Sequence, residues 1–161
     1  MVREFNIDLD KLNAHNLALI KKEGFMFPSD NEIINIPEEE KQFPTDVSNM
    51  DNETLLNKMA TFTALYASVA VKEALAIAET NGYERELDIT KSRVMQLSSS
   101  TKITEKRQEA SANDDVVRLQ EKLTVAESRL KLLSALRNAY EKAIFLYSRA
   151  LTVRNKEMEL Q

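Results

Sequence analysis

The sequence has no cysteine and very few residues that favour turns. Without cysteine the chain can form neither a disulfide framework nor a thiolate metal site, and it has no thiol nucleophile. Its two glycines and three prolines are too few for the many chain reversals of a sheet-rich fold. The sequence therefore predicts an all-α protein built from a few long helices.

Residues that carry chemistry are also scarce. The single histidine, His15, has no second histidine with which to share a metal ion, and a place on a helix surface is the simpler interpretation. Two glycines cannot build a phosphate-binding loop, and no serine has a histidine partner near it. The acidic runs at 38–40 and 114–115 are typical of solvated charge and of helix N-termini. We expect no enzyme activity, metal, cofactor or small-molecule substrate.

Long hydrophobic runs are missing as well. The first 16 residues, MVREFNIDLDKLNAHN, have no apolar run after their basic residue. No stretch of the chain approaches the roughly 18 uncharged residues that a membrane span needs. We therefore expect a soluble cytoplasmic protein without a membrane partner.

Residues 1–48 are predicted to form a short helix followed by an extended acidic arm. Leucine and isoleucine recur between Leu9 and Ile20, and the helix is expected to end at Gly24. All three prolines follow that glycine, together with three consecutive glutamates, so the arm cannot be a continuous helix. Residues 1–50 carry a net charge of −5, from 5 basic and 10 acidic side chains.

Residues 49–161 are predicted to form a long antiparallel helical hairpin. Its first helix is expected to begin near Asp51, where polar side chains can cap it, and to continue across Asn81-Gly82 to about Leu97. Apolar residues along it recur at alternating spacings of three and four, which is the heptad pattern of a helix that packs on another helix. These residues are Leu55, Met59, Phe62, Tyr66 and Val69, and Leu56, Thr63, Ala70 and Ile77 form a neighbouring row.

The second helix is expected to start near Asn113 or Asp114, after a reversal within residues 98–112 that is rich in serine and threonine. A heptad seam runs along this helix for about 43 residues, long enough to predict coiled-coil-like packing. Of its 13 positions, 11 are apolar. The seam consists of Val116, Leu119, Leu123, Ala126, Leu130, Leu133, Arg137, Tyr140, Ile144, Tyr147, Leu151, Arg154 and Met158.

Two such helices should pair, because each alone would leave a long apolar stripe in water. Leu132, Leu136 and Leu146 lie outside the seam and widen the apolar face beyond what one partner helix can cover. We therefore predict self-association into a homo-oligomer, with the seam residues forming the core or the contacts between subunits. Arg137 and Arg154 interrupt the seam, and we interpret them as interhelical ion-pair partners or snorkelling side chains.

One segment is basic in an otherwise acidic chain. The net charge of the whole chain is −4, whereas residues 91–107, which we name the basic segment, carry a net charge of +4. Its cations could neutralise the phosphates of single-stranded DNA, with Tyr83 and nearby hydroxyl groups adding stacking or hydrogen bonds. The alternative is solvated charge that pairs with the acids of residues 1–50. The cations are Lys91, Arg93, Lys102, Lys106 and Arg107.

The order of these elements resembles a known family. The resemblance is carried by F-P-T-D-V at 43–47, N-M-D-N-E-T-L-L at 49–56, A-S-A-N-D-D-V-V at 110–117 and S-R-A-L-T-V-R at 148–154. Over roughly residues 43–155 the chain is similar to small helical tailed-phage proteins related to the UvsY-type recombination mediators. The resemblance implies an oligomer of helical hairpins that binds single-stranded DNA and helps to load a recombinase, in the host cytoplasm for a phage-encoded chain.

The resemblance also implies that DNA is contacted by basic side chains on or just after the first long helix, which match the five cations of the basic segment. The chain departs from the family in its acidic, proline-containing arm and in having no tryptophan. Two other non-enzymatic functions are compatible with the pattern. One is a phage structural or assembly adaptor that acts through helix–helix contacts, and the other is a small inhibitor of a host defence protein.

Overall fold

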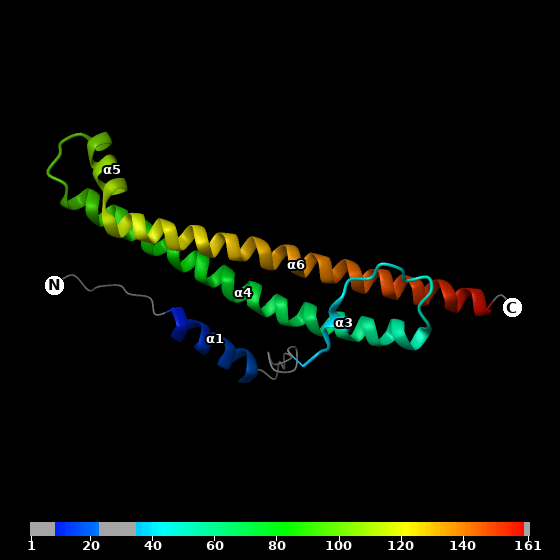
Figure 1. Ribbon diagram of the computed structural model, residues 1–161. Coiled ribbons are helices and arrows are strands. Elements are labelled where there is room, and N and C mark those ends of the chain that lie inside the picture. The colour runs from blue at the N-terminus through cyan, green and yellow to red at the C-terminus, as the bar shows by residue number, and fades with distance from the viewer. Residues whose placement is uncertain (1–8, 23–34, 160–161) are drawn as a thin grey trace. The chain divides into compact units, whose positions relative to one another are not determined.

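The computed structural model describes residues 9–22 and 35–159, and every regular element within these residues is a helix. The all-α class predicted from the sequence is therefore confirmed. Two helices of 46 residues each, α4 and α6, make up most of the described chain. In chain order (Figure 1) the helices are α1 (Leu9–Lys22), α3 (Glu38–Lys41), α4 (Asn52–Leu97), α5 (Ile103–Ala112) and α6 (Asp114–Glu159).

The bounds of α4 follow from its capping and packing. Asp51 accepts a hydrogen bond from the backbone N–H of Thr54 at 2.7 Å and a second from its hydroxyl at 3.1 Å. These bonds satisfy an unpaired amide of the first turn and hold the pKa of Asp51 below its usual value. The helix passes through Gly82 without a break and ends at Leu97, as predicted. Glycine costs roughly 1 kcal/mol in a helix interior, and the residue after it, Tyr83, packs against a buried cluster between the two long helices.

The start of α6 is also set by a cap. Asn113 is the only residue between α5 and α6, and its backbone is extended. Its side-chain oxygen accepts hydrogen bonds from the backbone N–H groups of Asp115 at 3.1 Å and Val116 at 3.4 Å. Asp114 and Asp115 also place negative charge in the first turn, where it stabilises the helix dipole. The second long helix therefore begins where the sequence predicts it.

The reversal between the long helices differs from the expectation of a loop over 98–112. The chain is non-helical over 98–102, and residues 103–112 form α5. This segment has no apolar row, which is why periodicity did not predict a helix. It is nevertheless rich in the strong helix formers glutamate, lysine, arginine, glutamine and alanine, and Ala110 is buried.

The described residues pack in two compact units that each contain part of α4 and part of α6. Among the described residues, unit 1 comprises 9–22 and 74–131, and unit 2 comprises 35–73 and 132–159. Within each unit the two helices run antiparallel. In unit 1, for example, Glu79 forms an ion pair with Arg129, whereas Leu87, later in α4, packs near the beginning of α6.

The core of unit 2 is aromatic. Phe62 and Tyr147 are fully buried with ring centroids 5.7 Å apart, and Tyr140 meets Phe62 edge to face at 5.6 Å. Leu55 and Ala143 complete this cluster. Aromatic rings bury more area than aliphatic side chains and gain from such tilted contacts, so this cluster is a major source of stability. In unit 1 the corresponding cluster is aliphatic and consists of Leu87, Val116 and Leu119.

A buried ion pair interrupts the apolar seam of unit 2. Glu73 of α4 is 5% exposed, and its carboxylate lies 2.7 Å from the guanidinium of Arg137 on α6. The hydroxyl of Ser134 donates a second hydrogen bond to Glu73. The interpretation of Arg137 as an interhelical ion-pair partner is thus confirmed. Because a buried charge without its partner costs several kcal/mol, this pair favours one register of α4 against α6.

The acidic arm includes a short helix that is attached to α4. Pro37 precedes α3 with the φ angle that suits a helix start, and its carbonyl accepts a hydrogen bond from Glu40 at 3.0 Å. The side chain of Lys58, in α4, donates a hydrogen bond of 2.6 Å to the carbonyl of Glu39. The three glutamates of the arm therefore lie in a helical turn, where the sequence analysis expected extended chain.

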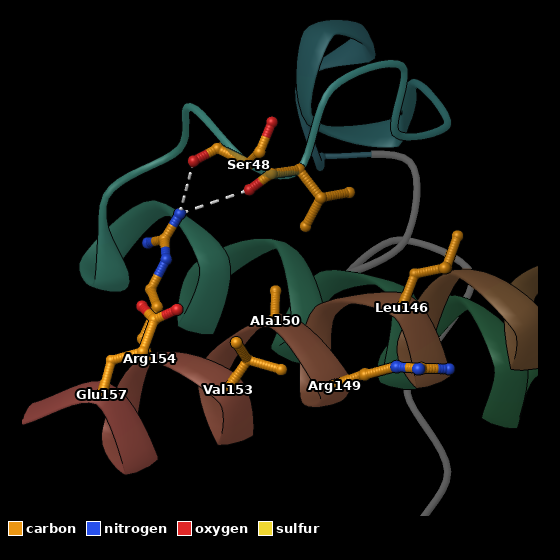
Figure 2. A pocket seen from close by; sticks show the side chains of 8 residues that line it. Ser48, Leu146, Arg149, Ala150, Val153, Arg154 and Glu157 are labelled. Atoms are coloured by element: carbon orange, nitrogen blue, oxygen red, sulfur yellow. Dashed lines mark hydrogen bonds between the residues drawn. The ribbon is translucent and has the colours of Figure 1, made fainter. Parts of the chain in front are cut away.

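The arm after α3 packs on the core of unit 2. The ring of Phe43 stacks on Tyr140 with centroids 5.6 Å apart, and Val47 packs against the aromatic cluster. Arg154, near the end of α6, donates hydrogen bonds to the carbonyls of Val47 at 3.3 Å and Ser48 at 2.9 Å, as Figure 2 shows. This part of the arm therefore belongs to the folded unit, although residues up to 48 were expected to form a separate extended segment.

The beginning of the chain is described only in part. Helix α1 ends at Lys22, and the glycine predicted to end it, Gly24, lies outside the described residues. His15 is exposed on α1, in agreement with its interpretation as a surface residue. The first of the three prolines, Pro28, also lies outside the described residues.

One window of α4 is strongly apolar. Eighteen residues within Asn52–Leu97 have a mean hydropathy of 1.3, and by length and composition alone they could cross a membrane. One third of the window, 33%, is buried inside the structure, and core helices of soluble proteins have the same properties. The cytoplasmic location stays a prediction.

Tyr147 carries a hydroxyl into the core where no described residue accepts or donates a hydrogen bond. An unsatisfied buried hydroxyl costs about 1–3 kcal/mol, so Tyr147→Phe should preserve or raise the free energy of unfolding at pH 7. Tyr147→Ala should lower it by about 3–5 kcal/mol because it leaves a cavity. Urea denaturation measures both changes. A loss of more than about 1 kcal/mol in the phenylalanine variant would mean that the hydroxyl has a partner.

Alkaline pH should act through the same side chain. Burial raises the pKa of Tyr147 above the usual value of about 10, so the unfolded chain releases this proton at a lower pH than the folded chain. The contribution of the protonated Tyr147 to the free energy of unfolding is fully present below about pH 10. It is lost as the pH rises through the pKa of Tyr147 in the folded state. We expect the wild-type protein to lose more stability between pH 9 and pH 11 than Tyr147→Phe does. Equal losses in the two proteins would contradict this assignment.

Truncation of the arm tests how much of it belongs to unit 2. Deletion of residues 1–34 should leave cooperative melting intact, because Phe43, Val47 and their contacts remain. Deletion of residues 1–48 should keep most of the helical circular dichroism but lower the melting temperature, since it removes side chains that cover the aromatic cluster. Identical melting temperatures for the two truncations would show that the arm contributes nothing to the core.

Candidate nucleic-acid interface

The five cations of the basic segment lie in unit 1, at the end of α4 and on the connection to α6. Lys91 and Arg93 are in the last two turns of α4. Lys102 is the residue before α5, and Lys106 and Arg107 are inside α5. The side chains of Lys102 and Arg107 are exposed, and the other three are half-buried. The fold thus collects these five cations within one connection and its two flanking helices.

A small network of hydrogen bonds orders the loop within this segment. The hydroxyl of Ser100 donates a hydrogen bond of 2.5 Å to the carboxylate of Glu105 and accepts one of 3.3 Å from the backbone N–H of Lys102. The Lys102 ammonium lies 3.1 Å from the same carboxylate. The bond from Ser100 and then the contact with Lys102 hold the pKa of Glu105 below its usual value. Glu105 is therefore ionised and neutralises one of the five cations.

The remaining four cations have no such partner. Within the described ranges, neither Lys91, Arg93, Lys106 nor Arg107 has a carboxylate within 4.0 Å of its charged group. The basic segment therefore has an excess of positive charge that is not neutralised by short contacts with the described residues. A charge of this kind is available to an anionic partner.

The acids of the arm make their contacts elsewhere. Glu38 forms an ion pair with Lys41 at 3.0 Å, and the carboxylate of Glu40 accepts a weak hydrogen bond of 3.4 Å from the hydroxyl of Thr61. The Asp46 carboxylate accepts hydrogen bonds from Ser48 and Asn49, which lower its pKa. All these partners belong to unit 2. For the acids that the structure describes in residues 35–50, pairing with the basic segment is therefore not observed.

Tyr83 differs in role from the stacking residue suggested by the sequence. Its ring packs against the aliphatic cluster of unit 1, and the ammonium of Lys122 lies 5.9 Å from the ring centroid. The ring thus serves helix packing, with a cation–π contact on α6. Base stacking on this residue would compete with both interactions.

The predicted seam residues mostly lie between α4 and α6 within the units. The fully or nearly fully buried ones are Leu55, Phe62, Val69, Val116, Leu119, Ala126 and Tyr147. The half-buried ones are Met59, Tyr66, Leu123, Leu130, Leu133, Tyr140, Ile144 and Leu151. Of the two roles left open for the seam, core and subunit contact, these burial values support the core. Met158, the last position of the seam, is 59% exposed.

Sequence reasoning missed several residues that hold these units together. Glu73 and Thr80 occupy heptad positions of α4 and are 5% and 6% exposed. Both are polar, so the apolar pattern gave no signal for them. The hydroxyl of Thr80 is satisfied by the carbonyl of Ala76 at 2.8 Å. If the alternating spacing of three and four along α4 is continued past Val69 and polar residues are accepted, it includes both Glu73 and Thr80.

Nothing in the described part of the chain resembles a metal centre. No group of three or more His, Cys, Asp or Glu side chains there is arranged to hold a metal ion. In comparisons with known proteins, no family model, curated protein or solved structure matches the chain. Its resemblance to the UvsY-type mediators accordingly rests on the sequence motifs.

Proposed function

We propose that this protein is a non-enzymatic DNA-recombination accessory protein, which binds single-stranded DNA through the basic segment and assists recombinase loading as a homo-oligomer. The observation that carries the proposal is the excess of cations between Lys91 and Arg107. Five cations lie there against one carboxylate, and that carboxylate is already engaged with Lys102 and Ser100.

Phosphate neutralisation is the interaction that such a segment can provide. A lysine or arginine beside a phosphate releases a condensed counterion, so binding depends on salt and is largely independent of sequence. Side chains that hold the backbone in this way leave the bases unpaired and accessible. Recombinase loading is added to the proposal by the resemblance of the sequence motifs to the UvsY-type mediators.

Valency supplies the affinity that one chain lacks. Five cations on one chain make few phosphate contacts, and each is weak at physiological salt. When several copies of the segment are held in one assembly, binding of the second becomes intramolecular with respect to the same strand. The proposal therefore requires self-association as well as positive charge.

An adaptor function is the second candidate, because apolar side chains are exposed on α6. Leu132 is 71% exposed and Leu146 is 47% exposed, and their spacing of 14 residues puts both side chains on the same side of the helix. A helix face of this kind can bind a helix of another protein. In that case the basic segment would be incidental, and DNA would not bind at low salt.

The DNA proposal is tested by charge removal at constant fold. Fluorescence anisotropy with a labelled oligothymidylate should show binding that weakens steeply with salt. Each single alanine change in the basic segment should lower the salt slope by about one, and the triple variant Arg93→Ala, Lys102→Ala, Arg107→Ala should abolish binding.

A matched triple variant controls for net charge. Lys21→Ala, Lys22→Ala, Lys131→Ala removes the same charge from exposed positions of α1 and α6 and should leave binding nearly unchanged. Equal losses in the two triple variants would mean that only total charge matters. If the wild-type protein fails to bind at micromolar concentration and low salt, the DNA proposal is wrong and the adaptor function is favoured.

Removal of the one acid in the segment should have the opposite effect. Glu105→Gln raises the local charge by one and releases Lys102, so it should tighten DNA binding and steepen the salt dependence. Glu157→Gln, an exposed carboxylate at the other end of α6, is the control and should have little effect. Weaker binding by Glu105→Gln would indicate that the order of the loop matters more than its charge.

A further inference from the structure

Helix α6 carries a second heptad row beside the seam that packs on α4. Starting at Leu132, apolar residues recur at alternating spacings of four and three without interruption. The row covers 22 residues of unit 2, or about 32 Å along the helix axis. We name it the outer row, and it consists of Leu132, Leu136, Ala139, Ala143, Leu146, Ala150 and Val153.

The large side chains of the outer row are directed away from α4. Each of its positions precedes a seam position by one residue, as Leu132 precedes Leu133 and Leu146 precedes Tyr147. At about 100° per residue, the outer row is therefore rotated by about 100° from the seam. The alanines at its edge toward the core are buried or half-buried, as at Ala143 with 2% exposure.

The large residues of the row are left in solvent. Leu132 is 71% exposed, Leu146 and Val153 are each 47% exposed, and Leu136 is 36% exposed. Isolated apolar residues on a surface need no explanation, but a row that keeps the heptad period over three heptads has the pattern of a helix-packing face. Such a face gains free energy when a second apolar stripe covers it.

The two ends of the row differ in shape. At the C-terminal end a hollow lies between α6 and the arm, with Leu146, Ala150 and Val153 on one side and Val47 with Ser48 on the other. Figure 2 shows these side chains around the hollow, with Arg149 beside it. At the N-terminal end the row presents Leu132, the most exposed of its side chains. The N-terminal end of the outer row therefore has a projecting side chain, and its C-terminal end has a hollow.

From this shape we infer that the outer row is the contact between two copies of this chain, which pair antiparallel about a two-fold axis. In that arrangement Leu132 of each copy enters the hollow beside Ala150 of the other, and the small Ala139 near the axis lets the helices approach closely. A parallel pair would instead place the projecting ends against each other and leave both hollows empty.

Charge and area fit the same arrangement. The row is bordered at seven-residue intervals by Ala135, Lys142, Arg149 and Lys156. In the antiparallel register Arg149 lies opposite Ala135 of the other copy, so like charges meet only at Lys142, on the axis. Two helix faces of this length bury on the order of 1,000 Å² in total, near the lower limit for a specific interface, so the pair should dissociate on dilution. The inference does not depend on DNA binding.

Sedimentation velocity over a dilution series of the full chain tests this contact. The wild-type protein should show reversible, concentration-dependent dimerisation. Leu132→Glu with Leu146→Glu should weaken it by more than ten-fold without loss of helical circular dichroism, because both side chains are already exposed. The matched variant Val117→Glu with Met158→Glu, at exposed apolar positions of α6 outside the row, should dimerise as the wild type does.

Disulfide cross-linking tests the orientation, since the natural chain has no cysteine. A variant with both Leu132→Cys and Ala150→Cys should form covalent dimers on oxidation, and the variant with Leu132→Cys alone should not. Covalent dimers from Leu132→Cys alone would overturn the antiparallel arrangement. A wild-type protein that stays monomeric at all concentrations, or an unchanged association of the Leu132→Glu, Leu146→Glu variant, would overturn the interface itself.

Discussion

The antiparallel packing of α4 against α6 is the interaction on which the other features of this chain depend. Each helix carries a heptad seam that would be costly in water, and within each unit the seams cover one another. Only after this pairing do the remaining surfaces acquire a role. The basic segment becomes the connection between the paired helices, and the outer row becomes a face that α4 does not cover.

The seam is not uniformly apolar, and its polar positions carry specificity. A seam of leucine and alanine alone tolerates slipped registers, whereas Glu73 has its carboxylate satisfied only when Ser134 and Arg137 lie opposite it. The aromatic cluster adds a second constraint in unit 2, because Phe62 and Tyr147 fill it completely. In unit 1 the buried cluster that the structure describes is aliphatic, and this unit bears the basic segment. The proposed DNA binding is thus assigned to unit 1, whose core is built from smaller side chains than that of unit 2.

The sequence predicts those features that depend on helix caps and on the spacing of apolar residues. The start of α4 at its Asp51 cap, its passage through Gly82 and the seam of α6 all follow from local capping and spacing, and the structure agrees. Helix α5 was missed because a helix without an apolar row has no period. The packing of Phe43 on Tyr140 was missed because it joins residues distant in sequence. The five cations could be found from local charge, but only the fold shows that four of them have no carboxylate of a described residue within 4.0 Å.

The antiparallel register of α4 and α6 is formed within one chain. Nitroxide labels on introduced cysteines test it directly, because the natural chain contains no cysteine to compete. Labels at Glu79→Cys and Arg129→Cys, an ion pair at 3.2 Å, should show strong dipolar coupling that persists when the labelled protein is diluted with unlabelled chain. Labels at Glu79→Cys and Lys122→Cys should couple more weakly. Lys122 lies one heptad before Arg129 in α6, which is about 10 Å further along the helix axis. Stronger coupling in the second pair, or loss of coupling on dilution, would contradict the account.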